Sequence, residues 1–109
     1  MRIASIMTVF PGCEAEYRRR HDELWPELAE HLKSVGITNY SIFLDPGSRQ
    51  LFAVFDAPDT FDPEQVSRHP VMQRWWDYMA DIMETQAGSN EPLQHPLTEV
   101  FRFNSTGEH

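Results

Sequence analysis

The sequence predicts an α+β fold built around a single antiparallel sheet. Four segments rich in β-branched and aromatic residues alternate with segments of helical composition, and glycine or proline lies at most of the boundaries. No internal repeat or low-complexity linker interrupts this order. A chain of 109 residues is long enough for one hydrophobic core but not for two. We therefore expect one domain over residues 1–103, followed by a flexible tail at residues 104–109.

The first part of the chain is expected to form one strand and two helices. Ile3–Phe10 is rich in β-branched and apolar residues and stops at Pro11-Gly12, as a strand does at a turn. Glu14–Glu23 has helical composition. Proline suits only the first turn of a helix, so Pro26 predicts a kink or a restart there, with a second helix over Pro26–Val35.

Two further strands are expected at Tyr40–Leu44 and Leu51–Ala57. The sequence Asp45-Pro46-Gly47-Ser48 between them is typical of a tight turn. Both strands carry apolar side chains at successive positions, so each is apolar on its two faces. In so small a chain, helices can cover only one face of the sheet. A second subunit is therefore expected to cover the other face.

The last part of the chain is expected to form a short helix, a longer helix and a final strand. Asp62-Pro63-Glu64 is a typical helix start, and Pro70 opens the longer helix. A polar loop over Thr85–Pro96 then leads into a strand over Leu97–Phe103. The order β-α-β-β-α-β is that of the ferredoxin-like fold, with a four-stranded antiparallel sheet and helices on one face.

Composition excludes several classes of partner. The net charge of −8 disfavours binding to nucleic acid or to an anionic membrane. No stretch approaches the roughly 20 apolar residues that span a bilayer, and the apolar run before Pro11 is too short for a secretory signal. The single cysteine, Cys13, excludes an intramolecular disulfide and indicates a reducing, cytoplasmic location. We expect Cys13 to begin a helix rather than to act as a nucleophile.

Metal and nucleotide chemistry are not indicated. No pair of histidines has the helical spacing, with a glutamate, that zinc hydrolases use. The chain contains neither a glycine-rich phosphate loop nor the G-x-S-x-G turn of serine hydrolases. We therefore expect no metal and no cofactor.

Tyr17 and His21 carry the clearest chemical signal, because a spacing of four puts the phenol and the imidazole on one helix face. Histidine is the side chain that exchanges a proton most readily near neutral pH. Three preceding arginines favour its neutral form and nearby carboxylates favour its charged form, so its protonation state stays open. The alternative is a surface histidine on a charged helix. Tyr17 either orients a substrate oxygen or covers the sheet.

Two adjacent indoles, Trp75 and Trp76, point about 100° apart on a helix. Trp75 shares the apolar stripe of Val71 and Met79 and is expected in the core. Trp76 lies at the edge of that stripe and is the better candidate for a pocket wall, although the pattern alone favours two core residues. Tyr40 either aims its hydroxyl into the same cavity or fills the core. Flat apolar rings beside an acid–base group suit a sugar, which has C–H faces and hydroxyl edges.

The residues resemble those of the L-rhamnose mutarotase family over about residues 2–103. The matching stretches are Glu16-Tyr17-Arg18-Arg19-Arg20-His21, Leu24-Trp25-Pro26-Glu27-Leu28, Asn39-Tyr40-Ser41-Ile42, Leu51-Phe52-Ala53, Gln73-Arg74-Trp75-Trp76, Tyr78-Met79 with Met83, and Glu99-Val100-Phe101. The region from Thr60 to His69, the loop from Glu84 to Pro96 and the tail depart from the family pattern.

This resemblance implies a homodimeric α/β barrel that interconverts the α and β anomers of L-rhamnose without a cofactor. By position, His21 matches the proton donor of the family. Tyr17, Tyr40, Trp75 and Trp76 match its substrate-binding residues. Two other interpretations stay open: an oxygenase or isomerase of the wider dimeric α/β-barrel group that acts on an aromatic or lipid-like substrate, and a non-catalytic sugar-binding module.

Overall fold

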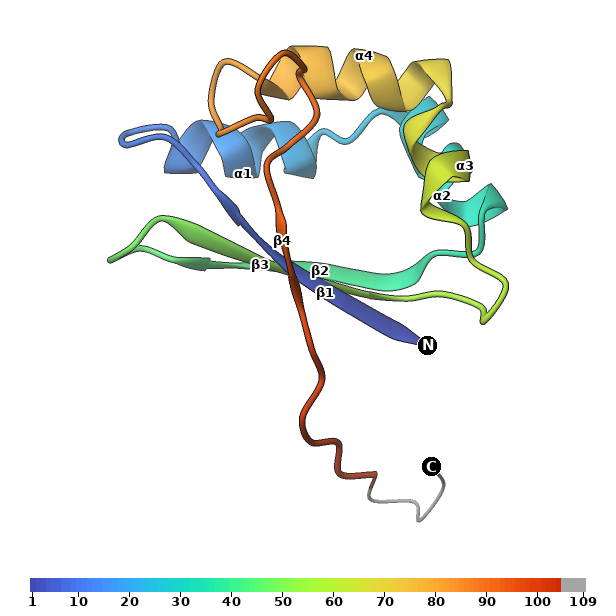
Figure 1. Cartoon of the computed structure of the whole chain (residues 1–109). Coiled ribbons are helices and arrows are strands. Elements are labelled where there is room, and N and C mark those ends of the chain that lie inside the picture. Colours follow the sequence, from blue (N-terminus) through green and yellow to red (C-terminus); the bar gives the residue numbers. More distant parts are fainter. Residues whose placement is uncertain (105–109) are drawn as a thin grey trace.

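The computed structural model describes residues 1–104 and shows a four-stranded antiparallel sheet with its helices on one face (Figure 1). The strands lie in the order β2-β3-β1-β4, and the predicted ferredoxin-like fold is confirmed. The elements in chain order are β1 (Arg2–Thr8), α1 (Glu14–Asp22), α2 (Pro26–Ser34), β2 (Thr38–Asp45), β3 (Gln50–Asp56), α3 (Pro63–Ser67), α4 (Pro70–Met79) and β4 (His95–Leu97).

The restart predicted at Pro26 is present, because α1 ends at Asp22 and Pro26 is the first residue of α2. A proline has no backbone N–H, so it fits the first turn of a helix but cannot continue one. Cys13 precedes the first residue of α1, as expected, and is a free thiol. None of the helices within residues 1–104 is long and apolar enough to cross a lipid bilayer.

The hairpin between β2 and β3 is held by Asp45, whose carboxylate accepts hydrogen bonds from the backbone N–H of Gly47 (3.1 Å) and the hydroxyl of Ser48 (2.8 Å). This is the side-chain turn chemistry that the sequence predicted. The pairing is interrupted between Thr38 and Ser41, where Asn39 has a φ of 52°. Such a bulge near the start of an edge strand increases its local twist.

The two faces of the sheet differ in what covers them. On the face toward the helices, Leu51 and Ala53 of β3 are buried. On the opposite face, Phe43 pairs with Phe52, which in turn pairs with Ile6, so three apolar side chains lie in a row. No helix within residues 1–104 covers this outer face (Figure 1), and the side chain of Phe43 is 62% exposed.

The final strand is shorter than predicted and lies earlier in the chain. It covers His95–Leu97, pairs with the segment from Ala4 to Ile6 of β1, and shares only Leu97 with the predicted strand. Continued pairing in this register would bring Glu99 opposite Arg2, where β1 begins, so residues 100–103 would have no partner strand. These residues instead leave the sheet on the side away from the helices (Figure 1). Of the tail predicted at residues 104–109, only Asn104 lies within the described residues.

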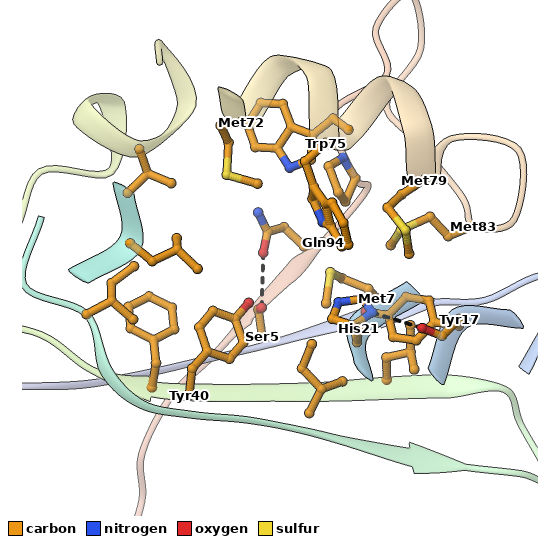
Figure 2. A pocket seen from close by; sticks show the side chains of 18 of the residues that line it. Ser5, Met7, Tyr17, His21, Tyr40, Met72, Trp75, Met79, Met83 and Gln94 are labelled. Carbon is orange, nitrogen blue, oxygen red and sulfur yellow. Dashed lines mark hydrogen bonds between the residues drawn. The ribbon is translucent and has the colours of Figure 1, made fainter. Parts of the chain in front are cut away.

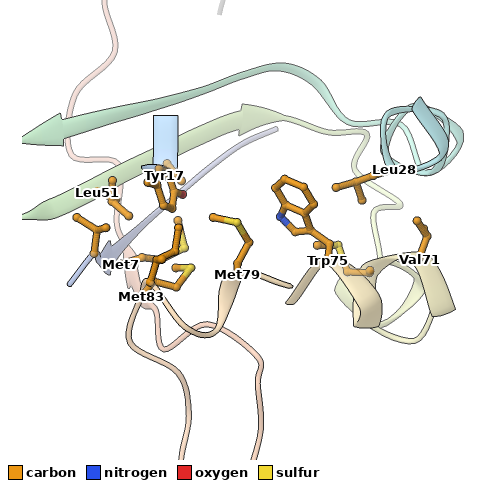
Figure 3. Packing of buried hydrophobic residues seen from close by; sticks show 12 residues of the cluster. Met7, Tyr17, Leu28, Leu51, Val71, Trp75, Met79 and Met83 are labelled. Atoms are coloured by element: carbon orange, nitrogen blue, oxygen red, sulfur yellow. The ribbon is translucent and has the colours of Figure 1, made fainter. Parts of the chain in front are cut away.

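The core lies between the sheet and the helices, and Figure 3 shows its packing. The stripe predicted for α4 is confirmed, since Val71, Trp75 and Met79 are all buried. The buried members of the core are Met7, Val9, Tyr17, Leu28, Leu51, Ala53, Val71, Met72, Trp75, Met79, Ile82 and Met83.

One charged side chain is buried beside this core. Arg20 of α1 is only 9% exposed, and its guanidinium donates to the Tyr78 carbonyl (2.6 Å) and to the Asp81 carboxylate (2.8 Å). It also binds Glu16 one turn earlier on α1 and lies over the ring of Tyr78, 4.3 Å from its centroid. Arg20 therefore joins the end of α1 to the end of α4.

Candidate active site

A cavity of about 1310 Å³ opens between the helices and the sheet. Its walls come from all four helices, from β1, β2 and β3, and from the segment around the start of β4, and most of its lining is apolar. The residues predicted for the site all line this cavity: Tyr17, His21, Tyr40, Trp75 and Trp76. Mostly apolar cavities with a few convergent polar groups are typical of small-molecule sites.

His21 lies in the last turn of α1 and is fixed by its own helix. Its Nδ1 atom lies 3.0 Å from the backbone carbonyl oxygen of Tyr17 (Figure 2). A carbonyl can only accept, so Nδ1 carries the hydrogen and donates it. In the neutral ring, Nε2 then keeps its lone pair and can take a proton. The imidazole stacks on the ring of Tyr17 at 4.3 Å and meets Trp75 edge-on at 5.4 Å.

The surroundings of His21 favour its neutral form. Burial lowers the pKa of His21 below its ordinary value, while the hydrogen bond to the Tyr17 carbonyl and the charge of Asp22 act in the opposite direction. Burial dominates because an imidazolium among aromatic rings loses its hydration. The protonation state that the sequence left open is therefore the neutral one at pH 7, with Nε2 as a proton acceptor.

Trp75 takes the core position that helical spacing predicted, and Trp76 lies at the edge of the core. Trp75 is 5% exposed and packs edge-on against Trp25 at 5.1 Å, so it belongs to the core and to the cavity wall at once. Trp76 is half-buried, packs against the core from its edge and also lines the cavity. Indole rings can cover the C–H face of a ligand and exclude water from it.

The two tyrosines bring phenol groups to the cavity from opposite layers. Tyr17 of α1 is buried, and this burial, with the nearby Tyr40 phenol, raises the pKa of Tyr17 far above its usual value. Its hydroxyl therefore stays protonated. Tyr40 of β2 stacks on Phe55 at 5.1 Å, and its hydroxyl points into the cavity although the residue is 43% exposed (Figure 2).

Sequence reasoning missed two members of the site and one residue that supports it. Trp25 entered the sequence analysis only within the stretch that resembles the mutarotase family, yet it packs edge-on against Trp75. Ser5 is a polar residue between the apolar Ile3 and Met7 on the face of β1 toward the helices. The alternation of side chains along a strand could have identified it. Gln94 lies in a segment predicted as loop and carried no signal. Within residues 1–104, no group of three or more histidine, cysteine, aspartate or glutamate side chains could hold a metal ion.

The fold and the cavity together define a class: a small ferredoxin-like protein in which a histidine, aromatic rings and phenol hydroxyls line one open cavity. The sequence pattern of L-rhamnose mutarotases matches residues 2–103. A relative from Jannaschia sp. named L-rhamnose mutarotase is 52% identical over 97 residues, which cover 89% of this chain and 92% of the relative. The chain belongs to the L-rhamnose mutarotase family.

Other relatives and solved structures agree with this assignment. An L-rhamnose mutarotase of Paraburkholderia xenovorans is 46% identical over 103 residues, covering 94% of this chain and 95% of the relative. The crystal structure of an L-rhamnose mutarotase from Formosa agariphila superposes with a TM-score of 0.87 at 38% identity, covering 95% of this chain and 99% of that one. A putative antibiotic biosynthesis monooxygenase from Bordetella bronchiseptica has a TM-score of 0.62 at 15% identity over 92% of this chain and 98% of its own, a likeness of fold alone.

Proposed function

We propose that the protein interconverts the α and β anomers of L-rhamnose by opening and reclosing the sugar ring, as a cofactor-independent isomerase of rhamnose metabolism. The observation that carries the proposal is the placement of His21. Its Nδ1 hydrogen is committed to the Tyr17 carbonyl, which leaves Nε2 for proton transfer inside the cavity. Membership of the mutarotase family supplies the substrate.

In the proposed reaction, a single nitrogen moves one proton between two oxygens. Nε2 of neutral His21 accepts the proton of the anomeric hydroxyl while the bond from C1 to the ring oxygen breaks. The imidazolium then donates that proton to the former ring oxygen, which becomes a hydroxyl. Both oxygens are bonded to C1 in the closed sugar, so one nitrogen can serve both. Rotation about the C1–C2 bond of the open aldehyde and the reverse transfers give the other anomer, with no net gain of protons or electrons.

The other predicted residues bind and orient the sugar in this proposal. The indoles of Trp75 and Trp76 cover the apolar face of the ring and its methyl group. The hydroxyls of Tyr17 and Tyr40 hold the sugar so that its anomeric carbon faces His21. Exclusion of water strengthens every hydrogen bond in the site.

Anomer exchange can be measured directly. Freshly dissolved α-L-rhamnose is added to the protein, and saturation-difference NMR follows the transfer of magnetisation between the two anomers. We expect acceleration that His21→Ala largely abolishes, and that the control His95→Ala retains because His95 does not line the cavity. Equal exchange rates with and without protein would refute the function, and binding without exchange would indicate a sugar-binding module.

The proposal extends to the assembly and location of the protein. A homodimer would cover the outer face of the sheet, where Phe43 is 62% exposed, and would close the α/β barrel. The single Cys13 supports a cytoplasmic location, with residues 1–103 acting as one domain. Sedimentation at micromolar concentration tests the dimer, since a lone 12.7 kDa species would contradict it.

A further inference from the structure

A polar pair lies in the cavity on a different wall from His21. The hydroxyl of Ser5 in β1 donates to the side-chain oxygen of Gln94, 3.0 Å away, and 89 positions separate the two residues in the chain. Both residues line the cavity. Figure 2 shows their hydrogen bond between Tyr40 and Trp75, apart from the bond that joins His21 to Tyr17.

The sheet explains why Ser5 points into the cavity. Ser5 pairs directly with Ala53, which is buried beneath the helices, and directly paired residues point to the same face. Its neighbours on that face of β1, Ile3 and Met7, are apolar. Ser5 is therefore the polar position of a strand face that is otherwise apolar.

Gln94 is exposed and brings to the same place hydrogen-bonding groups that no protein group within residues 1–104 uses. It immediately precedes β4, whose Pro96 pairs with Ser5, so the sheet register holds the two side chains together. The oxygen of its amide accepts from Ser5, while within residues 1–104 its amide nitrogen donates to no protein group. That nitrogen has two hydrogens, and the Ser5 oxygen keeps lone pairs that can accept.

We propose that Ser5 and Gln94 form a hydroxyl-recognition pair that selects the sugar by its hydroxyls remote from the anomeric carbon. The proposal rests on the proposed function, which places the anomeric carbon at His21. The Gln94 amide donates to one ring hydroxyl and the Ser5 oxygen accepts from the neighbouring one, as two adjacent polar groups can do for two adjacent hydroxyls. Gln94 and Ser5 would then act on specificity, and His21 on the chemistry.

The test removes the same contact from the protein and from the substrate. The value of kcat/KM is measured for the unmodified protein, Gln94→Leu and Ser5→Ala, with L-rhamnose and with its 2-deoxy, 3-deoxy and 4-deoxy analogues. We expect Gln94→Leu to lose roughly tenfold on L-rhamnose, the effect of about one hydrogen bond. On the analogue that lacks the contacted hydroxyl, the unmodified protein should lose roughly tenfold and Gln94→Leu should lose little more. Ser5→Ala should behave in the same way toward an adjacent hydroxyl.

A matched control and two refuting outcomes complete the test. Gln86→Leu makes the same substitution at a glutamine that does not line the cavity, and should leave kcat/KM unchanged for all four sugars. The proposal is refuted if both variants keep the full kcat/KM on L-rhamnose. It is also refuted if, for every analogue, the loss in kcat/KM from the substitution and the loss from the missing hydroxyl are additive in free energy. Should the unmodified protein not accelerate exchange, the proposed function fails, and dissociation constants for the same sugars decide whether the pair binds them. Absence of both exchange and binding overturns the two proposals together.

Discussion

The buried guanidinium of Arg20 should make a large contribution to stability, and Arg20→Met measures it. Methionine keeps the apolar stem of the side chain and removes the charge. The charged hydrogen bond to the Tyr78 carbonyl (2.6 Å) contributes about 1.5–3 kcal/mol. The contact with the Tyr78 ring at 4.3 Å contributes about 0.5–1 kcal/mol. The carboxylates of Glu16 and Asp81 are 35% and 68% exposed, so water replaces most of what they lose.

The expected loss in the free energy of unfolding is therefore about 3 kcal/mol, which lowers Tm by roughly 10 to 15 °C in a domain of this size. Urea and thermal unfolding, followed by circular dichroism at one fixed protein concentration, would measure it. Fixed concentration matters because an associating protein gains stability with concentration.

Arg19→Met is the matched control. It removes the same charge from the preceding residue of α1, which also binds Glu16, but the Arg19 side chain is 51% exposed and its ion pairs are exposed to solvent. We expect little change in Tm for this variant. Equal losses for the two variants would refute the reasoning, because burial of Arg20 would then not be what distinguishes them. The Asp81 carboxyl, whose pKa Arg20 lowers, should titrate closer to its ordinary value in Arg20→Met.

Two further outcomes follow from His21 and from the outer face of the sheet. Burial lowers the pKa of His21, so the unfolded chain takes up a proton more readily. The free energy of unfolding therefore carries no penalty from His21 above the unfolded pKa of about 6.5. It falls as pH drops from that value through the lower folded pKa. His21→Gln should flatten the slope of unfolding free energy against pH in that window, and an identical slope would contradict the assignment. Phe43→Lys places a charge on the outer face and should shift sedimentation toward the 12.7 kDa monomer, whereas an unchanged dimer would show that this face is not the interface.

The fold was predictable from the sequence where local chemistry decides it. The restart at Pro26 and the turn at Asp45 depend on a missing N–H and on a short side-chain hydrogen bond, and both can be read from neighbouring residues. The final strand was placed wrongly because its extent depends on where β1 begins, far away in the chain. Apolar residues such as Val100, which is 93% exposed, resemble a strand in sequence although they pair with no strand within residues 1–104.

In the candidate site, too, some features could be predicted from the sequence and others could not. The shared face of Tyr17 and His21 follows from helical spacing, and the structure brings them together. The neutral state of His21 could not be predicted, since burial outweighs the neighbouring charges that a sequence displays. The pairing of Ser5 with Gln94 could not be predicted either, because only the sheet register brings them together.

The hydrogen bond from His21 to the carbonyl of Tyr17 lies within a single turn of α1, so folding orients the imidazole before any sugar arrives. In the proposed reaction, a proton-transfer group oriented in this way needs no rearrangement when the substrate binds. Two anomers differ only in the direction of one hydroxyl at C1, and both would meet the same fixed nitrogen. Under the proposed mechanism, one nitrogen held by its own helix therefore serves both directions of the exchange, and neither anomer requires a second orientation of the imidazole.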